Sequence, residues 1–194
     1  MHGLHRRAIL VIVASVFSGV TALARDVGAQ PCVADFSPPL NVTLPDGLRT
    51  LVGEMLAQSP RFQEQWQTLV TLPQLRLTVH VGPILGPYRA QSIVHRYQYG
   101  LIVAVVELPA FGNRIELLAH EFEHVIEQTE GLDLRQLARG RSSGVHDLGY
   151  AYETKRAYEA GRRVALECDR HKKSMDTCRT SVDRSETDLR NIDR

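Results

Sequence analysis

The spacing of apolar residues along the chain predicts helices first, strands next and then helices again. Apolar positions recur every three or four residues over 46–57 and 60–70, which is typical of helices with one buried face. The second of these segments starts at Ser59-Pro60. This pair favours a helix N-terminus, because serine caps the helix and proline fits its first turn.

Strand patterns occupy the middle of the chain. Alternating apolar and polar residues over 75–81 predict a half-buried strand, and residues 89–97 are a further strand candidate. The valine-rich run 101–108 predicts a buried strand. Helical spacing returns over 115–129 and 150–167, so the order of the elements indicates an α+β domain with segregated layers.

The two ends of the chain differ from this central part. Residues 1–24 combine an early pair of arginines, a short apolar run and an Ala-Leu-Ala ending, which predicts a secretory signal peptide. A membrane anchor is the less favoured interpretation, because the uncharged stretch 8–24 only reaches the lower length limit of a bilayer span. We therefore expect a periplasmic or secreted domain over 25–168 with no stable membrane span, and a polar, disordered tail over 169–194.

Composition narrows the classes of partner. Hydrophobic residues form 43% and charged residues 23% of the chain, as in folded globular proteins, and the net charge is +1. No basic stripe is interleaved with aromatic residues, so nothing in the sequence indicates nucleic-acid binding.

Export would expose the cysteines to oxidation. There are three of them, Cys32, Cys168 and Cys178, and an odd number leaves one without a partner in the same chain. We expect a disulfide between Cys168 and Cys178, which would close a short loop near the C-terminus.

The strongest chemical signal is the segment His120-Glu121-Phe122-Glu123-His124. On a helix with about 100° per residue, His124 lies about 40° from His120, so both imidazoles can reach one metal ion. Glu121 lies about 100° from His120, beside the coordination position that a catalytic zinc site leaves to water. The pattern predicts Zn²⁺ held by both histidines, with Glu121 as the general base that activates a zinc-bound water.

A catalytic zinc site needs a third protein ligand. Glu130 follows the motif at a suitable separation, but a continuing helix would carry it away from the metal. His146 and Asp147 lie in a glycine-containing segment that could fold back toward the histidines, and both remain candidates.

Glu153 is the favoured third ligand because of the charge pattern around it. On a helical wheel, Ala157 and Ala160 lie within about 40° of Glu153, and the other charged residues of that segment lie elsewhere on the wheel. A lone carboxylate on such a face is costly to bury unless it is paired or binds a metal. The small residues, Gly161 included, would also let this helix approach the histidine helix closely.

The chain resembles the gluzincin group of zinc metallopeptidases, and especially its small, minimal-domain members. The resemblance rests on the motif at 120–124, followed by Tyr152-Glu153-Thr154 and Ala157. It implies a zincin-like fold, in which a small sheet packs on the H-E-x-x-H helix and on a following helix that bears the glutamate.

The resemblance also implies roles for residues. The zinc ligands would be His120, His124 and Glu153, the general base would be Glu121, and the strand at 101–108 would line the substrate cleft. Four residues could polarise the carbonyl of a substrate, namely His146, Tyr150, Tyr152 and Arg156.

The function implied by the resemblance is that of an exported, zinc-dependent metallopeptidase that hydrolyses peptide bonds in peptide or protein substrates. A different class of function would use the same ligands. In that alternative the protein is a zinc-stabilised, non-catalytic binding module of the cell envelope, and Glu121 has no role in turnover.

Overall fold

The computed structural model describes residues 36–83, 89–140, 142–149 and 151–190, with side chains up to residue 175. The predicted signal peptide and Cys32 lie outside these residues. The described part is a mixed α+β domain, as the order of sequence patterns predicts.

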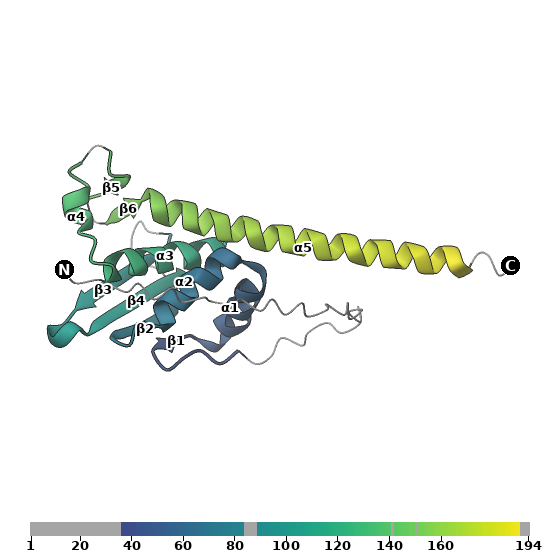
Figure 1. Ribbon diagram of the computed structural model, residues 1–194, viewed down its shortest axis with the longest axis horizontal. Coiled ribbons are helices and arrows are strands. Elements are labelled where there is room, and N and C mark those ends of the chain that lie inside the picture. Colours follow the sequence, from purple (N-terminus) through teal and green to yellow (C-terminus); the bar gives the residue numbers. More distant parts are fainter. Residues whose placement is uncertain (1–35, 84–88, 141, 150, 191–194) are drawn as a thin grey trace, which may run out of the picture. The chain divides into compact units, whose positions relative to one another are not determined.

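A four-stranded sheet forms one layer of the domain (Figure 1). Its strands, in spatial order, are β1 (Val42–Thr43), β2 (Leu75–Gly82), β4 (Ile102–Pro109) and β3 (Gln91–Arg96). β1 and β4 run parallel to β2, whereas β3 pairs antiparallel with β4 and forms an edge of the sheet. Alternate residues of β2 and β4 are buried, so one face of the sheet packs against the rest of the domain.

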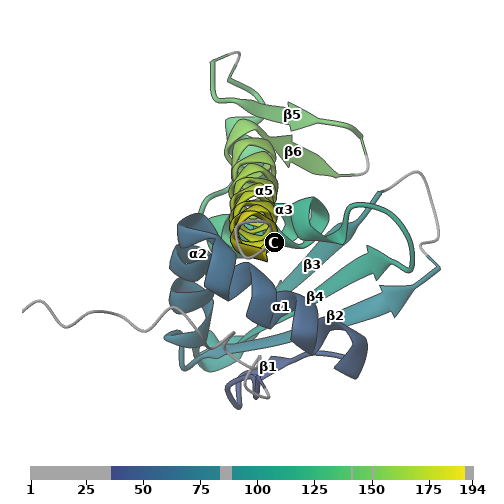
Figure 2. The same ribbon diagram turned by 90° about the vertical axis from the view of Figure 1, so that its right-hand side faces the viewer.

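Three helices gather on one side of the sheet (Figure 2). They are α1 (Asp46–Gln58), α2 (Pro60–Val70) and α3 (Arg114–Thr129), within a residue or two of the predicted ranges. Helix α3 packs on β3 and β4, and α2 packs on α1 and α3. Phe62 of α2 and Phe122 of α3 stack in the core, with ring centroids 5.8 Å apart. The aromatic contact joins the helix that bears the motif to the first half of the chain.

The segment between α3 and the last helix contains three short elements that apolar periodicity does not predict. They are α4 (Leu134–Leu137), β5 (Val145–Asp147) and β6 (Tyr152–Thr154). β5 and β6 form a small antiparallel hairpin of their own. Short elements of three or four residues hold too few positions for a period to emerge.

The predicted helix at 150–167 is wrong at its start, because α5 (Lys155–Arg190) begins five residues later. Thr154 explains the boundary: its hydroxyl accepts a hydrogen bond from the backbone N–H of Ala157 at 3.0 Å. This is the contact of an N-cap residue with the third residue of its helix. Glu153 therefore lies on β6 and not on the helix.

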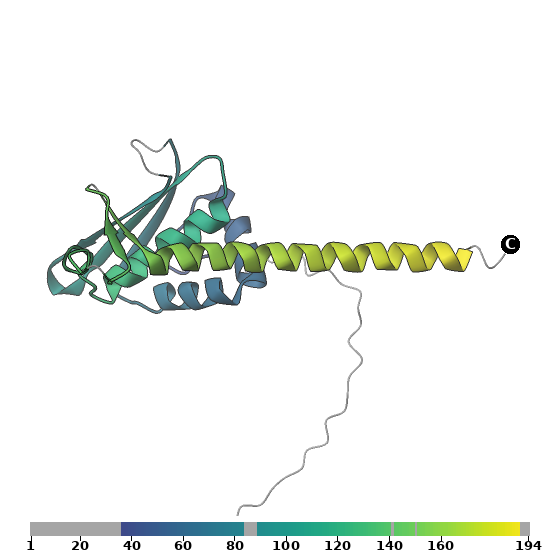
Figure 3. The ribbon, with the colours of Figure 1, turned by 90° about the horizontal axis from the view of Figure 1, so that it is seen from above.

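Over most of the tail that the sequence predicts to be disordered, the structure continues α5 to Arg190. Its C-terminal part lacks an apolar stripe, but it contains neither glycine nor proline to break the helix. Among the side chains of α5 that the structure describes, up to Met175, Cys168 is the last buried one, and the first part of the helix runs alongside α3 and α2 (Figure 3).

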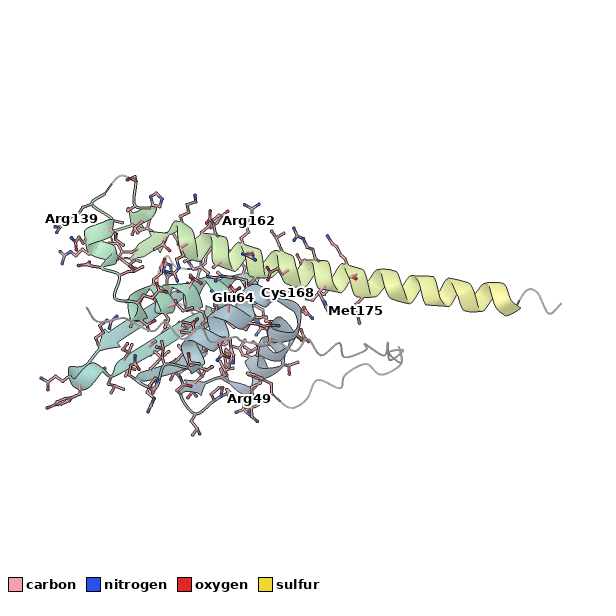
Figure 4. All side chains as sticks on the ribbon, in the orientation of Figure 1. Arg49, Glu64, Arg139, Arg162, Cys168 and Met175 are labelled. Carbon is pink, nitrogen blue, oxygen red and sulfur yellow. The ribbon has the colours of Figure 1, made fainter. Side chains whose placement is uncertain are left out.

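The predicted disulfide between Cys168 and Cys178 is incompatible with this helix. Ten residues of α-helix separate their Cα atoms by about 15 Å, whereas a disulfide needs less than about 7 Å. Cys168 is a free, buried thiol of the core (Figure 4), on the side of α5 that meets α1 and α2. None of the helices in the described part of the chain is both long and apolar enough to span a bilayer.

Helix α5 approaches α3 closely at Gly161. A Cβ atom added there would lie 2.7 Å from the carbonyl oxygen of Glu116 and 3.0 Å from the Cβ of His120. Ala157 and Ala160 are buried in the same interface. This confirms the prediction that the small residues let the two helices approach closely.

Gly161→Ala should therefore destabilise the fold by about 1–3 kcal/mol, because the contacted atom is backbone and cannot move aside cheaply. Urea denaturation measures this change. The matched control is Gly47→Ala in α1, where an added Cβ meets nothing within 4 Å. That substitution should stabilise the protein by up to about 1 kcal/mol. Equal effects of both substitutions would contradict the close packing at Gly161.

A second contact between α5 and the first half of the chain joins Glu167 to the start of α2. The Glu167 carboxylate accepts hydrogen bonds from the Ser59 hydroxyl at 2.6 Å and from the backbone N–H of Arg61 at 3.1 Å. Burial acts to raise the pKa of Glu167, but these bonds and the Arg163 guanidinium more than offset it, so its pKa is lowered. The carboxylate also lies at the positive end of the α2 dipole.

Because the folded-state pKa of Glu167 is lowered, its contribution is present above its unfolded-state pKa of about 4.3 and is lost as the pH falls through the folded value. Glu167→Gln should cost about 1–2 kcal/mol of unfolding free energy near pH 7. The difference from wild type should shrink below about pH 4. Denaturant midpoints of both proteins between pH 3 and pH 7 measure this, and a difference that does not vary with pH would contradict it.

Candidate metal centre

Helix α3 holds both motif histidines at the surface of a cavity. Asn113 caps the helix by accepting a hydrogen bond from the backbone N–H of Glu116 at 3.4 Å. His120 and His124 lie one turn apart, and their ring centroids are 4.8 Å apart. The imidazole of His120 is 17% exposed and that of His124 is 9% exposed, so both remain reachable from one side.

Glu153 meets the two histidines from β6. One carboxylate oxygen lies 3.4 Å from Nε2 of His120, and the other lies 3.9 Å from Nε2 of His124. Two atoms bound to one tetrahedral zinc at 2.0–2.1 Å are about 3.4 Å apart. The donor set of two imidazole nitrogens and one carboxylate, and its spacing, therefore fit a metal ion of this kind.

The three residues form a group that could hold a metal ion, with donor atoms within 4.8 Å of one another. The rival ligands lie elsewhere in the structure. Glu130 caps the end of α3 and pairs with Arg156 at 2.5 Å, as expected for a helix that carries it away. His146 and Asp147 lie exposed on β5, outside this group of described residues. The structure thus brings together the favoured set, and the role of its members as ligands stays a prediction.

Glu153 lies beside the histidines for a reason that differs from the predicted one. A helical wheel placed Glu153 on the inner face of a helix, whereas it projects from the strand just before that helix. The same wheel identified the buried face of α5 correctly, with Ala157 and Ala160 in the interface. The N-cap residue Thr154 is the sequence signal that marks the true helix start.

Glu121 lies beside this group and is 4% exposed. Its burial raises the pKa of the carboxyl, and the neighbouring imidazoles and the hydroxyl of Ser92 on β3 only partly oppose this effect. A carboxylate whose pKa lies above the ordinary range is a better proton acceptor at neutral pH.

His120 and Glu153 shift each other's pKa. Burial acts to lower the pKa of His120, but the hydrogen bond to Glu153 and the charge of Glu121 raise it. Burial acts to raise the pKa of Glu153, but His120 and His124 lower it. The site is therefore rich in negative charge that attracts a cation, and a metal ion would compete with the proton on His120.

A carboxylate that sequence reasoning missed holds the second histidine. Nδ1 of His124 lies 3.0 Å from a carboxylate oxygen of Glu127, and Glu127 is buried. The signal was available in the sequence, because residues three apart on a helix are neighbours. A hydrogen bond at Nδ1 leaves Nε2 of His124 to face Glu153, as metal binding requires.

The group opens onto a cavity of about 680 Å³. His120, His124, Glu121 and Glu153 all line this cavity. Strand β3 contributes Gln91–Val94 to the wall, whereas no residue of β4 reaches it. The expectation that the strand at 101–108 lines the cleft is wrong, because β4 lies inside the sheet and β3 forms the edge beside the cavity.

The residues proposed to polarise a substrate carbonyl have different places. Tyr152 lines the cavity. Arg156 is held by Glu123 and Glu130, and His146 is exposed on β5 and is not part of the lining. Tyr150 lies outside the described residues. Tyr158 of α5, which the sequence did not single out, also lines the cavity and is 52% exposed.

Comparison of the chain with protein-family models, with curated proteins and with solved structures finds no match. The interpretation of the site therefore depends on its own geometry and chemistry.

If Glu153 is a ligand, Glu153→Ala should lower the affinity for Zn²⁺ by more than the roughly 10–100-fold typical of losing an outer-sphere partner. Competition with a chromophoric chelator measures the affinity. The matched control is Glu130→Ala, which removes a carboxylate outside the group and should leave zinc affinity near the wild-type value. Unchanged affinity of Glu153→Ala would return His146 and Asp147 as candidates.

Proposed function

We propose that the protein is a zinc-dependent metallopeptidase of the gluzincin type, with a zincin-like fold, that hydrolyses peptide bonds outside the cytoplasm. The observation that carries the proposal is the convergence of His120, His124 and Glu153 at the wall of a cavity, with Glu121 beside them. The export of the protein remains a prediction from residues 1–24, which lie outside the described part.

Zinc is the metal that suits this donor set, because two imidazoles and one carboxylate leave a tetrahedral ion one further position. When bound, zinc acts as a Lewis acid that acidifies water and polarises a carbonyl group. A redox-inactive ion of this kind supports hydrolysis without any further cofactor.

Glu121 is suited to move the proton in this reaction. Its carboxylate accepts a proton from the water that attacks the peptide carbonyl and then donates it to the leaving amine nitrogen, as the C–N bond breaks. Burial favours this cycle, because it raises the pKa of the Glu121 carboxyl toward neutral pH.

The edge strand β3 supports an extended peptide as the substrate. β3 pairs with β4 on one side only in the described sheet, so its other edge can pair with a further strand. Its residues Gln91–Val94 form a wall of the cavity next to Glu121. A peptide added along this edge would pass the group formed by His120, His124 and Glu153. The backbone of the peptide would make most of its contacts with β3.

The experiment that tests the proposal compares wild type with Glu121→Gln. The mature protein should bind one zinc ion and cleave peptides in a fluorogenic peptide library. Glu121→Gln should retain zinc and lose about 10²–10⁴-fold in kcat/KM, because the amide cannot accept the proton. Removal of zinc with a chelator should abolish cleavage, and added zinc should restore it.

Two other results would contradict the proposal in different ways. Stoichiometric zinc without cleavage by wild type would favour the non-catalytic, zinc-stabilised binding module. Absence of stoichiometric zinc would reject both functions. A residue remote from the cavity, such as Glu64 in α2, supplies the control Glu64→Gln, which should change neither zinc content nor cleavage.

A further inference from the structure

Besides Glu121, helix α3 buries two further glutamates, Glu123 and Glu127, which lie one turn apart in different surroundings. Glu123 is fully buried, and two arginines bind it: Nη2 of Arg61 at 2.7 Å and Nε of Arg156 at 2.6 Å. The side-chain amide of Gln65 donates a further hydrogen bond at 2.7 Å. The negative charge of Glu123 is thus compensated within the fold.

Glu127 is only 2% exposed, but its partners carry no permanent charge. One oxygen accepts a hydrogen bond from the Thr154 hydroxyl at 2.8 Å, and the other lies 3.0 Å from Nδ1 of His124. Among the residues that the structure describes, neither lysine nor arginine forms an ion pair with Glu127. A buried carboxylate without a cation is costly, so its counter-charge must come from another source.

Metal binding at Nε2 of His124 would fix the directions of the hydrogen bonds around Glu127. The Thr154 hydroxyl already accepts the N–H of Ala157, so its own proton is free to point to Glu127. For Nε2 of His124 to bind a metal, the proton must lie on Nδ1 and point to Glu127. Both oxygens of Glu127 therefore act as acceptors, and the metal position lies on the far side of the His124 ring.

We propose that Glu127 is a positioning residue that holds two metal ligands at once, and that the bound cation compensates its charge. It fixes the tautomer of His124 directly. It also anchors Glu153, because Thr154 is the next residue along β6. The inference rests on the metal site of the proposed function, but it makes a separate claim about which buried glutamate serves that site.

The first test substitutes each buried glutamate by glutamine, which keeps the volume and removes the charge. In Glu127→Gln the side-chain NH₂ group replaces one of the two acceptor oxygens. It then either faces the Thr154 hydroxyl or Nδ1–H of His124, both of which are donors, or shifts His124 to the tautomer that cannot bind metal through Nε2. Its affinity for Zn²⁺ should fall about 10–100-fold. The absorption spectrum of the Co²⁺-substituted protein should change as the ligand geometry loosens. The metal-free protein should resist denaturant as well as wild type or better, since an uncompensated buried charge has gone.

The matched control is Glu123→Gln. This variant removes the buried carboxylate that the partly exposed Arg61 and Arg156 share, so the metal-free protein should be less stable in urea, while zinc affinity stays close to wild type. The two glutamates should thus show opposite patterns in two assays, metal affinity and stability without metal.

Thr154 provides a second test that does not alter the charge. Thr154→Val removes the hydroxyl at equal volume and should weaken zinc binding, whereas Thr154→Ser keeps the hydroxyl and should restore it. Both variants are compared at the same folded fraction, measured by circular dichroism.

The outcomes separate this inference from the proposed function. If wild type binds no zinc, the metal site fails and this inference fails with it. If wild type binds zinc and Glu127→Gln binds it equally well, the site stands and the role of Glu127 is rejected. Parallel losses of stability and affinity in both glutamine variants would also reject it, because they would show that both residues are merely structural.

Discussion

The site depends on how closely α5 can approach α3. In their interface Gly161 of α5 faces the backbone of Glu116 in α3, at a distance that leaves no room for a side chain. This approach holds the first part of α5 against α3, and β6 directly precedes α5. Glu153 is two residues before the helix, so the same packing brings its carboxylate to the histidines.

Charged and polar contacts also fix the start of α5 on α3. Arg156, in the first turn of α5, binds both Glu123 of α3 and the C-cap residue Glu130, which holds the start of α5 against α3. Glu127 holds the same turn at a second point through Thr154. This second contact, whose carboxylate has no arginine or lysine partner among the described residues, is the one that a bound metal would strengthen.

Sequence patterns predict the long helices well, and they also predict that the two histidines share one helix face. Both predictions follow from the regular period of a helix. α2 occupies the predicted residues, and the wheel of α5 finds its buried face. Patterns fail where one residue decides a boundary. Thr154 starts α5 by capping it, and the wheel, extended past that cap, assigned Glu153 to a helix. A local pattern also does not show which strand forms the edge of the sheet. β4 is the more apolar strand because it lies inside the sheet, whereas β3 lies at the edge and lines the cavity.

The strand that carries Glu153 belongs to a hairpin of two three-residue strands, which has little stability of its own. Such a hairpin keeps a ligand in place only if its neighbours hold it. At the base of β6 the structure supplies the Thr154 contact to Glu127 and the N-cap bond to Ala157. The remaining freedom lies at Glu153 itself, 38% exposed, whose contacts in the site are with the two histidines. A metal ion bound by these three side chains would therefore complete the docking of the hairpin, so folding of this part of the site and metal binding should be coupled.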